Sequence, residues 1–247
     1  MRLIGLLSFL LLLNVGQAQI KISEKENIPL FHASLGGHLP LNDLAERFGP
    51  NASVAGGFLY KTKSNFLFGA DFQYLFGNEI YEEGLLDHLQ TSAGAYLNMN
   101  GEYSDVIMYE SGYFAGIRLG YLIPVRKEFP NSGIILSVGA GLLEHKIWIS
   151  SQGNMVPSLV GDYRNGYDRL TNGFAAQGFV GYMHLGKNQF ANFFGGIEYT
   201  RAWTQNRRSL NYDTRETDTQ KRIDSLFGVR IGWMIPIYRG VSSSYYY

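Results

Sequence analysis

The sequence of 247 residues contains no cysteine, and only 17% of its residues are charged. Without cysteine the chain can form no disulfide, no thiolate-ligated metal site and no thiol nucleophile. Its 21 basic and 21 acidic residues cancel, so it lacks the basic excess expected of a nucleic-acid-binding protein. Glycine (30 residues) and aromatic residues (15%) are abundant instead, whereas glycine averages about 7% in globular proteins.

The sequence also lacks any apolar run of the roughly 20 residues that a membrane-spanning helix needs. Its longest run, residues 3–13, follows Arg2 and precedes Gly16 and Ala18, whose spacing is typical of a signal peptidase site. We therefore expect residues 1–18 to be a secretory signal peptide and the mature chain to begin at Gln19. An exported chain of this kind can enter a membrane only as a closed barrel, because the alternative, a spanning helix, is missing.

Apolar and polar residues alternate with a period of two in three segments, 66–76, 113–123 and 227–237. In the second segment, for example, Tyr113, Ile117 and Tyr121 alternate with Gly116 and Arg118. A period of two is typical of β-strands. Similar but less regular patterns complete a set of eight predicted strands, at 30–39, 52–61, 133–149, 173–185 and 190–205.

The predicted connections alternate strictly between long and short. An even number of strands with alternating short turns and long loops is typical of a bacterial outer-membrane barrel, with the turns in the periplasm and the loops outside the cell. We predict an all-β fold, an eight-stranded antiparallel transmembrane β-barrel with both chain termini in the periplasm. Its expected parts are a signal peptide (1–18), a periplasmic segment (19–29), the barrel (30–241) and a tail (242–247).

A soluble lipocalin-like barrel also has eight alternating strands, with its apolar face inward. The glycines at positions 116, 120, 228 and 232 favour the membrane barrel, since glycine on a water-facing strand surface only weakens the strand. In a narrow lumen the same glycines would leave space for an arginine side chain. The opposite face carries almost uninterrupted Phe, Tyr, Trp and Ile, as a lipid-facing band would.

Several loop and strand strings resemble the small outer-membrane barrels of Bacteroidota. These are PLNDLAERFG from Pro40, GGFLYKT from Gly56, FGADFQYLFG from Phe68, GDYRNGYDRLTNG from Gly161 and QNRR from Gln205. The resemblance covers the mature chain and implies an eight-stranded barrel in the outer membrane, in a group whose members mostly lack an assigned activity. The PorT-like and PorG-like barrels of this general type are accessory parts of type IX secretion, which implies the same role as an alternative here.

Little in the sequence points to catalysis, a cofactor or a metal. The five histidines lack the spacing of a zinc protease. His32 and His38 share the expected lumen face of the first strand, where we expect ordinary hydrogen-bonded side chains. His145 lies near the predicted outer rim with Ser150 and Ser151, and it is the one residue that an outer-leaflet lipid-modifying enzyme would use. We expect no enzyme, and such an enzyme is the third functional hypothesis.

Four charged residues fall on the expected lumen face at matching heights of neighbouring strands. Asp71 faces Arg118 between the third and fourth strands, and Glu198 faces Arg230 between the seventh and eighth. Buried charges are costly unless they are paired, so we predict two ion pairs that plug the lumen. The alternative is a charged ion path, which requires a continuous column of water.

The third and fourth long loops combine charges with aromatic residues. Exposed aromatic groups in a loop indicate a folded cap or a partner site, whereas the charges alone fit a solvated surface beside lipopolysaccharide. We predict a structural or partner-binding barrel whose partners are outer-membrane lipid, lipopolysaccharide and another envelope protein. The candidate partner-binding residues are Tyr163, Tyr167, Asp168, Arg169, Arg207 and Arg208. A barrel-assembly signal is expected at Tyr247 or within 233–238.

Overall fold

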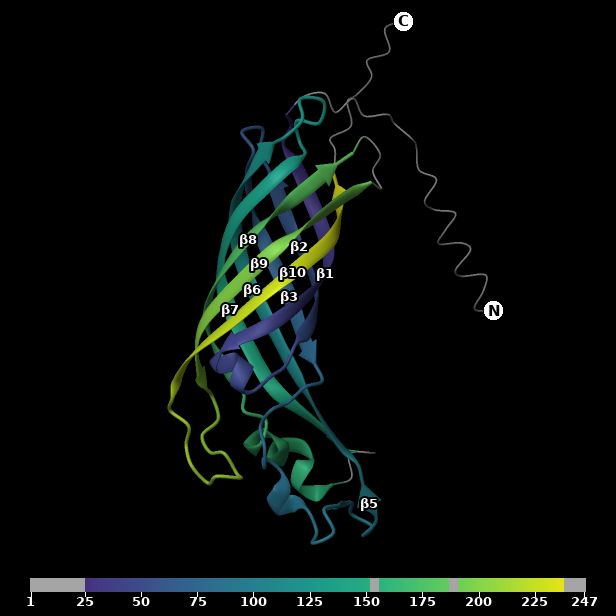
Figure 1. Ribbon diagram of the computed structural model, residues 1–247, viewed down its shortest axis with the longest axis vertical. Coiled ribbons are helices and arrows are strands. Elements are labelled where there is room, and N and C mark those ends of the chain that lie inside the picture. Colours follow the sequence, from purple (N-terminus) through teal and green to yellow (C-terminus); the bar gives the residue numbers. More distant parts are fainter. Residues whose placement is uncertain (1–24, 152–155, 187–190, 238–247) are drawn as a thin grey trace, which may run out of the picture.

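A closed barrel of eight antiparallel strands forms the body of the protein (Figure 1). The computed structural model describes residues 25–151, 156–186 and 191–237. Each strand pairs with its neighbours in the chain, and the first and last strands close the ring. The strands are β1 (Ile28–Asn42), β2 (Asn51–Lys61), β3 (Phe66–Gly77), β6 (Val106–Pro124), β7 (Gly133–Ser151), β8 (Thr171–Leu185), β9 (Asn192–Asn206) and β10 (Lys221–Pro236). The predicted fold class is confirmed.

The strands are longer than the alternation of residues predicts at several ends. β1 begins at Ile28, two residues before the alternating segment 30–39, and β10 begins at Lys221, six residues before the alternating segment 227–237. β6 and β7 pair along 19 residues, from Val106 opposite Ser151 to Pro124 opposite Gly133. Backbone hydrogen bonding between the strands therefore continues beyond the segments in which apolar and polar residues alternate. The predicted signal peptide, the start at Gln19 and the tail with Tyr247 lie outside the described residues.

The short turns lie at one end of the barrel and the long loops at the other, as Figure 1 shows. Within the described residues, the loop end carries four 3-10 helices, η1 (Asp43–Glu46), η2 (Asp87–Leu89), η4 (Pro157–Leu159) and η5 (Gly161–Gly166). It also carries the hairpin of β4 (Tyr96–Leu97) and β5 (Tyr103–Ser104), which lies farthest from the barrel. The loops therefore fold into a cap of their own.

The outer wall of the barrel is an apolar surface with aromatic residues near both ends. Phe66 and Tyr121 pack edge to face near the turn end, and Phe174 and Trp203 stack near the loop end. Along β9 the exposed outward residues run from Phe193 to Trp203. Ten steps of about 3.3 Å along a strand tilted by about 40° span about 25 Å, the height of the apolar band of an outer-membrane barrel. No helix within the described ranges is long and apolar enough to cross a membrane.

Inward residues fill the lumen in three layers. An apolar cluster occupies the turn end, with Leu30, Leu122, Met183 and Met234 among its members. A second cluster occupies the loop end, where side chains of the loops join those of the strands. Between them lie buried polar and charged residues of the strands.

The lumen glycines correct one detail of the sequence interpretation. We expected them to make room for arginine, but their space is filled mostly by rings. A Cβ atom on Gly228 would meet the ring of His38, and one on Gly232 would meet the ring of Phe194. On Gly120 the neighbour is Ser137, whose Cβ would lie 2.7 Å away. The small residues thus allow aromatic side chains to lie flat against a narrow wall.

Two glycines of β8 provide a matched test of this packing. A Cβ on Gly173 would overlap the carbonyl oxygen of Trp203, whereas a Cβ on Gly178 has no atom within 4 Å. Gly173→Ala should therefore destabilise the barrel by about 1 to 3 kcal/mol, the cost of forced overpacking. Gly178→Ala should be neutral or slightly stabilising. The temperature at which heated protein changes its gel mobility in mild detergent measures both effects, and equal temperatures for the two variants would contradict the prediction.

Candidate functional site

The first half of the polar layer in the lumen is centred on Asp71 of β3. Its Oδ1 lies 2.7 Å from Nε2 of His32 on β1, and its Oδ2 lies 2.5 Å from Nη2 of Arg118 on β6. The register explains the second contact, because Arg118 pairs with Gly69, two residues from Asp71 on the same face. All three side chains are buried, so this carboxylate is held by a cation and a histidine away from solvent.

The second half is centred on Glu198 of β9. Its Oε1 lies 2.7 Å from Nε2 of His38 and accepts a hydrogen bond of 3.1 Å from Gln73. Its Oε2 lies 3.0 Å from Nε of Arg230 on β10. Arg230 is fully buried, and its Nη atoms have no hydrogen-bond partner within the part of the chain that the structure describes. Its guanidinium lies 5.4 Å from the centre of the Phe179 ring, an arrangement that favours a cation.

Two glutamines connect these halves into one network. Arg118 donates to Oε1 of Gln177 at 3.0 Å, and Gln177 donates to Oε1 of Gln73 at 3.5 Å and to Thr200 at 3.1 Å. Gln73 also donates to Ser53 at 3.0 Å. We call this set of side chains from β1, β2, β3, β6, β8, β9 and β10 the lumen network. Its members are His32, His38, Ser53, Asp71, Gln73, Arg118, Gln177, Phe179, Glu198, Thr200 and Arg230.

The lumen network balances its own charge. Two arginines face two carboxylates, and Arg118 and Arg230 lie 5.6 Å and 5.4 Å from the same Phe179 ring. Removing these four charges from water is expensive, and the cost is recovered only when each has an opposite charge or hydrogen bonds close by. The structure therefore brings together the two residue pairs selected from the sequence, Asp71 with Arg118 and Glu198 with Arg230.

A third histidine–carboxylate pair lies nearer the loops. Nε2 of His145 is 2.8 Å from Oδ2 of Asp224, which also accepts a hydrogen bond of 2.5 Å from Thr204. His145 is buried beneath the ring of Phe48 from the first loop. As an active-site residue it would have to reach lipid at the outer rim, and the packed Phe48 ring and barrel wall lie in the way. Its contacts are those of a structural lumen residue.

No group of three or more His, Asp and Glu side chains that could hold a metal ion occurs among residues 25–151, 156–186 and 191–237. A polar cleft of about 440 Å³ lies at the loop end and is lined by Arg47, Arg169, Arg222, Glu82 and residues of the fourth loop. Its three arginines already have carboxylate partners, Glu82, Asp213 and Asp218. The cleft therefore offers a ligand few uncompensated charges.

Two bidentate ion pairs join the third and fourth loops. Arg208 donates to both oxygens of Asp168, at 2.8 Å and 2.5 Å, and Arg169 donates to both oxygens of Asp213, at 3.0 Å and 2.6 Å. The hydrogen bond to Asp168 raises the pKa of the Arg208 guanidinium above its ordinary value. Arg207 instead donates to Oδ1 of Asn172 on β8 at 2.6 Å. The charges predicted to bind a partner are mostly satisfied within the chain.

The aromatic residues of the third loop divide into a buried and an exposed one. Tyr167 is buried, with its hydroxyl 3.1 Å from Nε2 of His88 and its ring packed edge-on against Tyr212. Burial and the charge of Asp213 raise the pKa of the Tyr167 phenol, so it stays protonated near neutral pH. Tyr163 is 66% exposed. Of the six candidate residues, Tyr163 is the one whose aromatic ring is open to a partner.

Comparisons with known proteins give similarity in structure alone. No protein-family description and no curated protein matches the sequence. The solved structures that resemble the chain include Ail, the attachment invasion locus protein of Yersinia pestis (TM-score 0.46, 11% identity, covering 85% of this chain and 99% of that one). Neisserial surface protein A (0.38, 12%, 83% and 96%) and OprG from Pseudomonas aeruginosa (0.36, 9%, 86% and 97%) are also similar. The resemblance to Bacteroidota barrels stays a prediction.

Sequence reasoning missed the histidine contacts and the glutamine bridge. It placed His32 and His38 in the lumen but did not assign them to Asp71 and Glu198. Strand register could have revealed both, since Gly57 of β2 pairs with His32 and with Asp71, and Gly228 of β10 pairs with His38 and with Glu198. Gln177 carried no signal, because a single polar residue on a strand does not indicate which partner it meets.

Removing one charge of a lumen ion pair should lower the stability of the barrel more than removing both charges does. Asp71→Ala leaves Arg118 buried without its carboxylate, which should lower the stability by about 3 to 5 kcal/mol. The double variant Asp71→Asn/Arg118→Met removes both charges and should lose less than the single variant does. Thermal mobility shifts in detergent would test the order, and a double variant less stable than Asp71→Ala would contradict it.

Tyr167 and Tyr163 should respond differently to replacement by serine. Tyr167→Ser removes the ring between His88 and Tyr212 and should speed cleavage of the third loop by a non-specific protease. The hydrogen bonds between the barrel strands do not involve this ring, so the thermal mobility shift should change little. Tyr163→Ser is the matched control, with wild-type cleavage expected. Equal cleavage rates in the two variants would show that Tyr167 does not hold the cap.

Proposed function

We propose that the protein is a non-enzymatic barrel of the bacterial outer membrane that is closed to ion flow and acts through its outer surface. The observation that carries this proposal is the filling of the lumen. Apolar clusters lie above and below the charge-balanced lumen network. An eight-stranded barrel has room for side chains and little more, so a continuous column of water is not accommodated.

The membrane location is supported by the outer wall. Exposed Phe, Ile, Leu and Val side chains cover the outward faces of the strands, and aromatic residues are concentrated near both ends. Such a surface would be an aggregation hazard in water, whereas lipid accommodates it. Short turns at one end and folded loops at the other fit the periplasmic and extracellular sides of the outer membrane.

Reconstitution of the full chain into planar bilayers tests the closed lumen. Wild-type protein should insert, resist unfolding in detergent until heated, and give no steady ionic current. The Asp71→Ala variant, with an uncompensated cation, should remain closed at the apolar layers if it folds. A steady current through the wild-type protein would overturn the proposal, and recovery of the mature protein from the soluble periplasm would overturn the membrane location.

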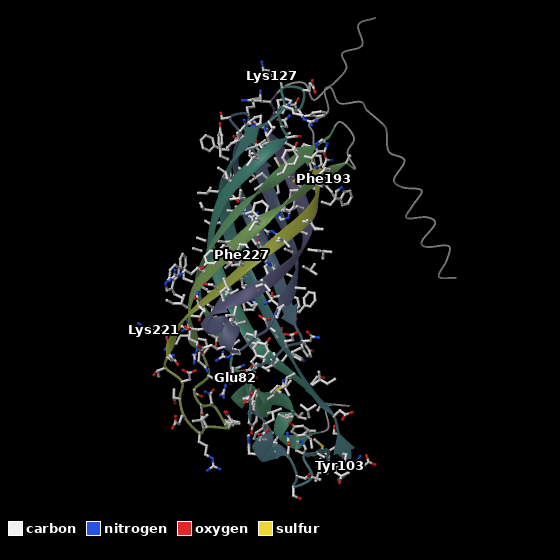
Figure 2. All side chains as sticks on the ribbon, in the orientation of Figure 1. Glu82, Tyr103, Lys127, Phe193, Lys221 and Phe227 are labelled. Carbon is white, nitrogen blue, oxygen red and sulfur yellow. The ribbon has the colours of Figure 1, made fainter. Side chains whose placement is uncertain are left out.

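A second candidate function is that of an accessory subunit that docks another envelope protein. One observation favours it: the hairpin of β4 and β5 presents apolar side chains far from the barrel (Figure 2). Tyr103 is 73% exposed and Met99 is 64% exposed, and Leu97 lies on the same hairpin. Exposed aromatic and methionine side chains are enriched at protein interfaces.

Cross-linking in intact envelopes separates this candidate from a purely structural barrel. The Tyr103→Ser/Met99→Ser variant should lose a cross-linked partner that the wild-type protein retains, because these side chains would form the centre of the contact. Tyr163→Ser provides a control at an exposed aromatic residue of the third loop, away from the hairpin. Identical cross-linked products for the wild-type and hairpin variants would leave the structural barrel as the better description.

A further inference from the structure

One arginine of the barrel strands faces outward without a carboxylate partner. Arg118, Arg222 and Arg230 point inward or towards the loops and form ion pairs with Asp71, Asp218 and Glu198. Arg201 on β9 is exposed on the outer wall, and no ion pair within 4.0 Å involves it in the described ranges of the chain. Its guanidinium carbon lies 5.8 Å from the centre of the Trp203 ring.

The position of Arg201 relates it to the membrane surface. It lies between the exposed residues Tyr199 and Trp203 on the same face of β9, just inside the aromatic residues at the loop end. An arginine on the lipid-facing side of a barrel is costly at the middle of the bilayer, and this cost falls towards the interface. At this depth the negative groups within reach are those of lipid headgroups.

Two further cations lie above Arg201 on the side of the loops. Lys221 begins β10 on the outward face, and Figure 2 shows it on the same edge of the barrel as Phe227, nearer the loops. Arg207 follows the end of β9 and is held by Asn172 of β8. We call Arg201, Arg207 and Lys221 the basic patch. Three acidic residues lie nearby: Glu144 accepts a hydrogen bond from Asn172 at 2.9 Å, Asp43 accepts one from the backbone N–H of Ile223 at 2.7 Å, and Asp218 is paired with Arg222.

The basic patch has two levels. Lys221 pairs with Gln205, four residues beyond Arg201 along β9. Four steps of about 3.3 Å on a tilted strand correspond to about 10 Å along the barrel axis. A phospholipid with one phosphate at the interface would reach Arg201 alone. A lipid that also carries anionic groups on sugars extending outward would reach both levels.

We propose that the basic patch binds a phosphate-bearing glycolipid of the lipopolysaccharide type from the outer leaflet. Arg201 contacts the phosphate nearest the acyl chains, and Lys221 and Arg207 contact anionic groups farther out. The planar guanidinium of Arg201 can donate two hydrogen bonds to one phosphate group. The stacked rings of Phe174 and Trp203 form the apolar floor beside Arg201. This inference rests on the proposed membrane location of the strands.

Lipid retention by the full chain tests the inference. The protein is inserted into phosphatidylcholine vesicles that contain either lipopolysaccharide or phosphatidylglycerol as the sole anionic component. It is then extracted in mild detergent, and native mass spectrometry measures the lipid that stays bound. Arg201→Gln and Lys221→Gln should each reduce bound lipopolysaccharide about fivefold, the effect of one basic residue at an anionic surface. Lys127→Gln, in an exposed turn at the opposite end (Figure 2), is the matched control and should retain lipid as the wild-type protein does.

Each outcome has a definite meaning. Loss with both patch variants but not with Lys127→Gln supports the glycolipid site. Equal retention of phosphatidylglycerol and lipopolysaccharide, or a loss with Arg201→Gln alone, overturns the two-level glycolipid assignment. Wild-type protein that inserts and resists heat but retains no lipopolysaccharide overturns this inference and leaves the proposed function intact. Failure of the wild-type protein to insert at all counts against the proposed function itself.

Discussion

Space inside an eight-stranded barrel is the constraint on which the other features of this protein depend. Inward residues of opposite strands meet across a lumen that admits side chains and little water, so a charged residue there must find its partner within the chain. Asp71 and Glu198 each find an arginine and a histidine. Because the partners come from seven strands, the lumen network can be complete only when the barrel has closed in one register, and a slip of one residue would move its charges to the lipid side.

The filled lumen determines where function can lie. Apolar side chains seal both sides of the lumen network, and the loops add Leu44, Phe48 and Tyr167 to the outer seal. In the closed barrel that we propose, the interior contributes stability and specificity of pairing, while the surfaces that can meet other molecules are the cap and the wall. Within the cap, Arg208 and Arg169 are neutralised by Asp168 and Asp213, so their charges are not available to a ligand.

Much of the fold could be predicted because a strand with two environments has a period of two. The eight strands and the alternation of short and long connections follow from that pattern, and so does the common face of Asp71 and Arg118. The cap could not be predicted in this way, since bidentate contacts such as Arg208 with Asp168 depend on how two loops fold over each other. Sequence alone cannot tell that Tyr167 is buried and Tyr163 exposed, because both are tyrosines of the same loop, four positions apart.

An arginine inside the barrel and an arginine on its outer wall need different partners for their charges. Inside, Arg230 has no access to solvent, so its charge is tolerated only because Glu198 lies 3.0 Å away and the Phe179 ring faces it. Outside, in the membrane location that we propose, Arg201 has lipid below it and the membrane surface beside it, and Trp203 provides an aromatic neighbour but no negative charge. A carboxylate on the outer wall would satisfy Arg201 but would itself have to be desolvated in the apolar band. An anion supplied by the membrane avoids that cost, because the headgroup is already at the interface, and this difference favours a lipid as the partner of Arg201.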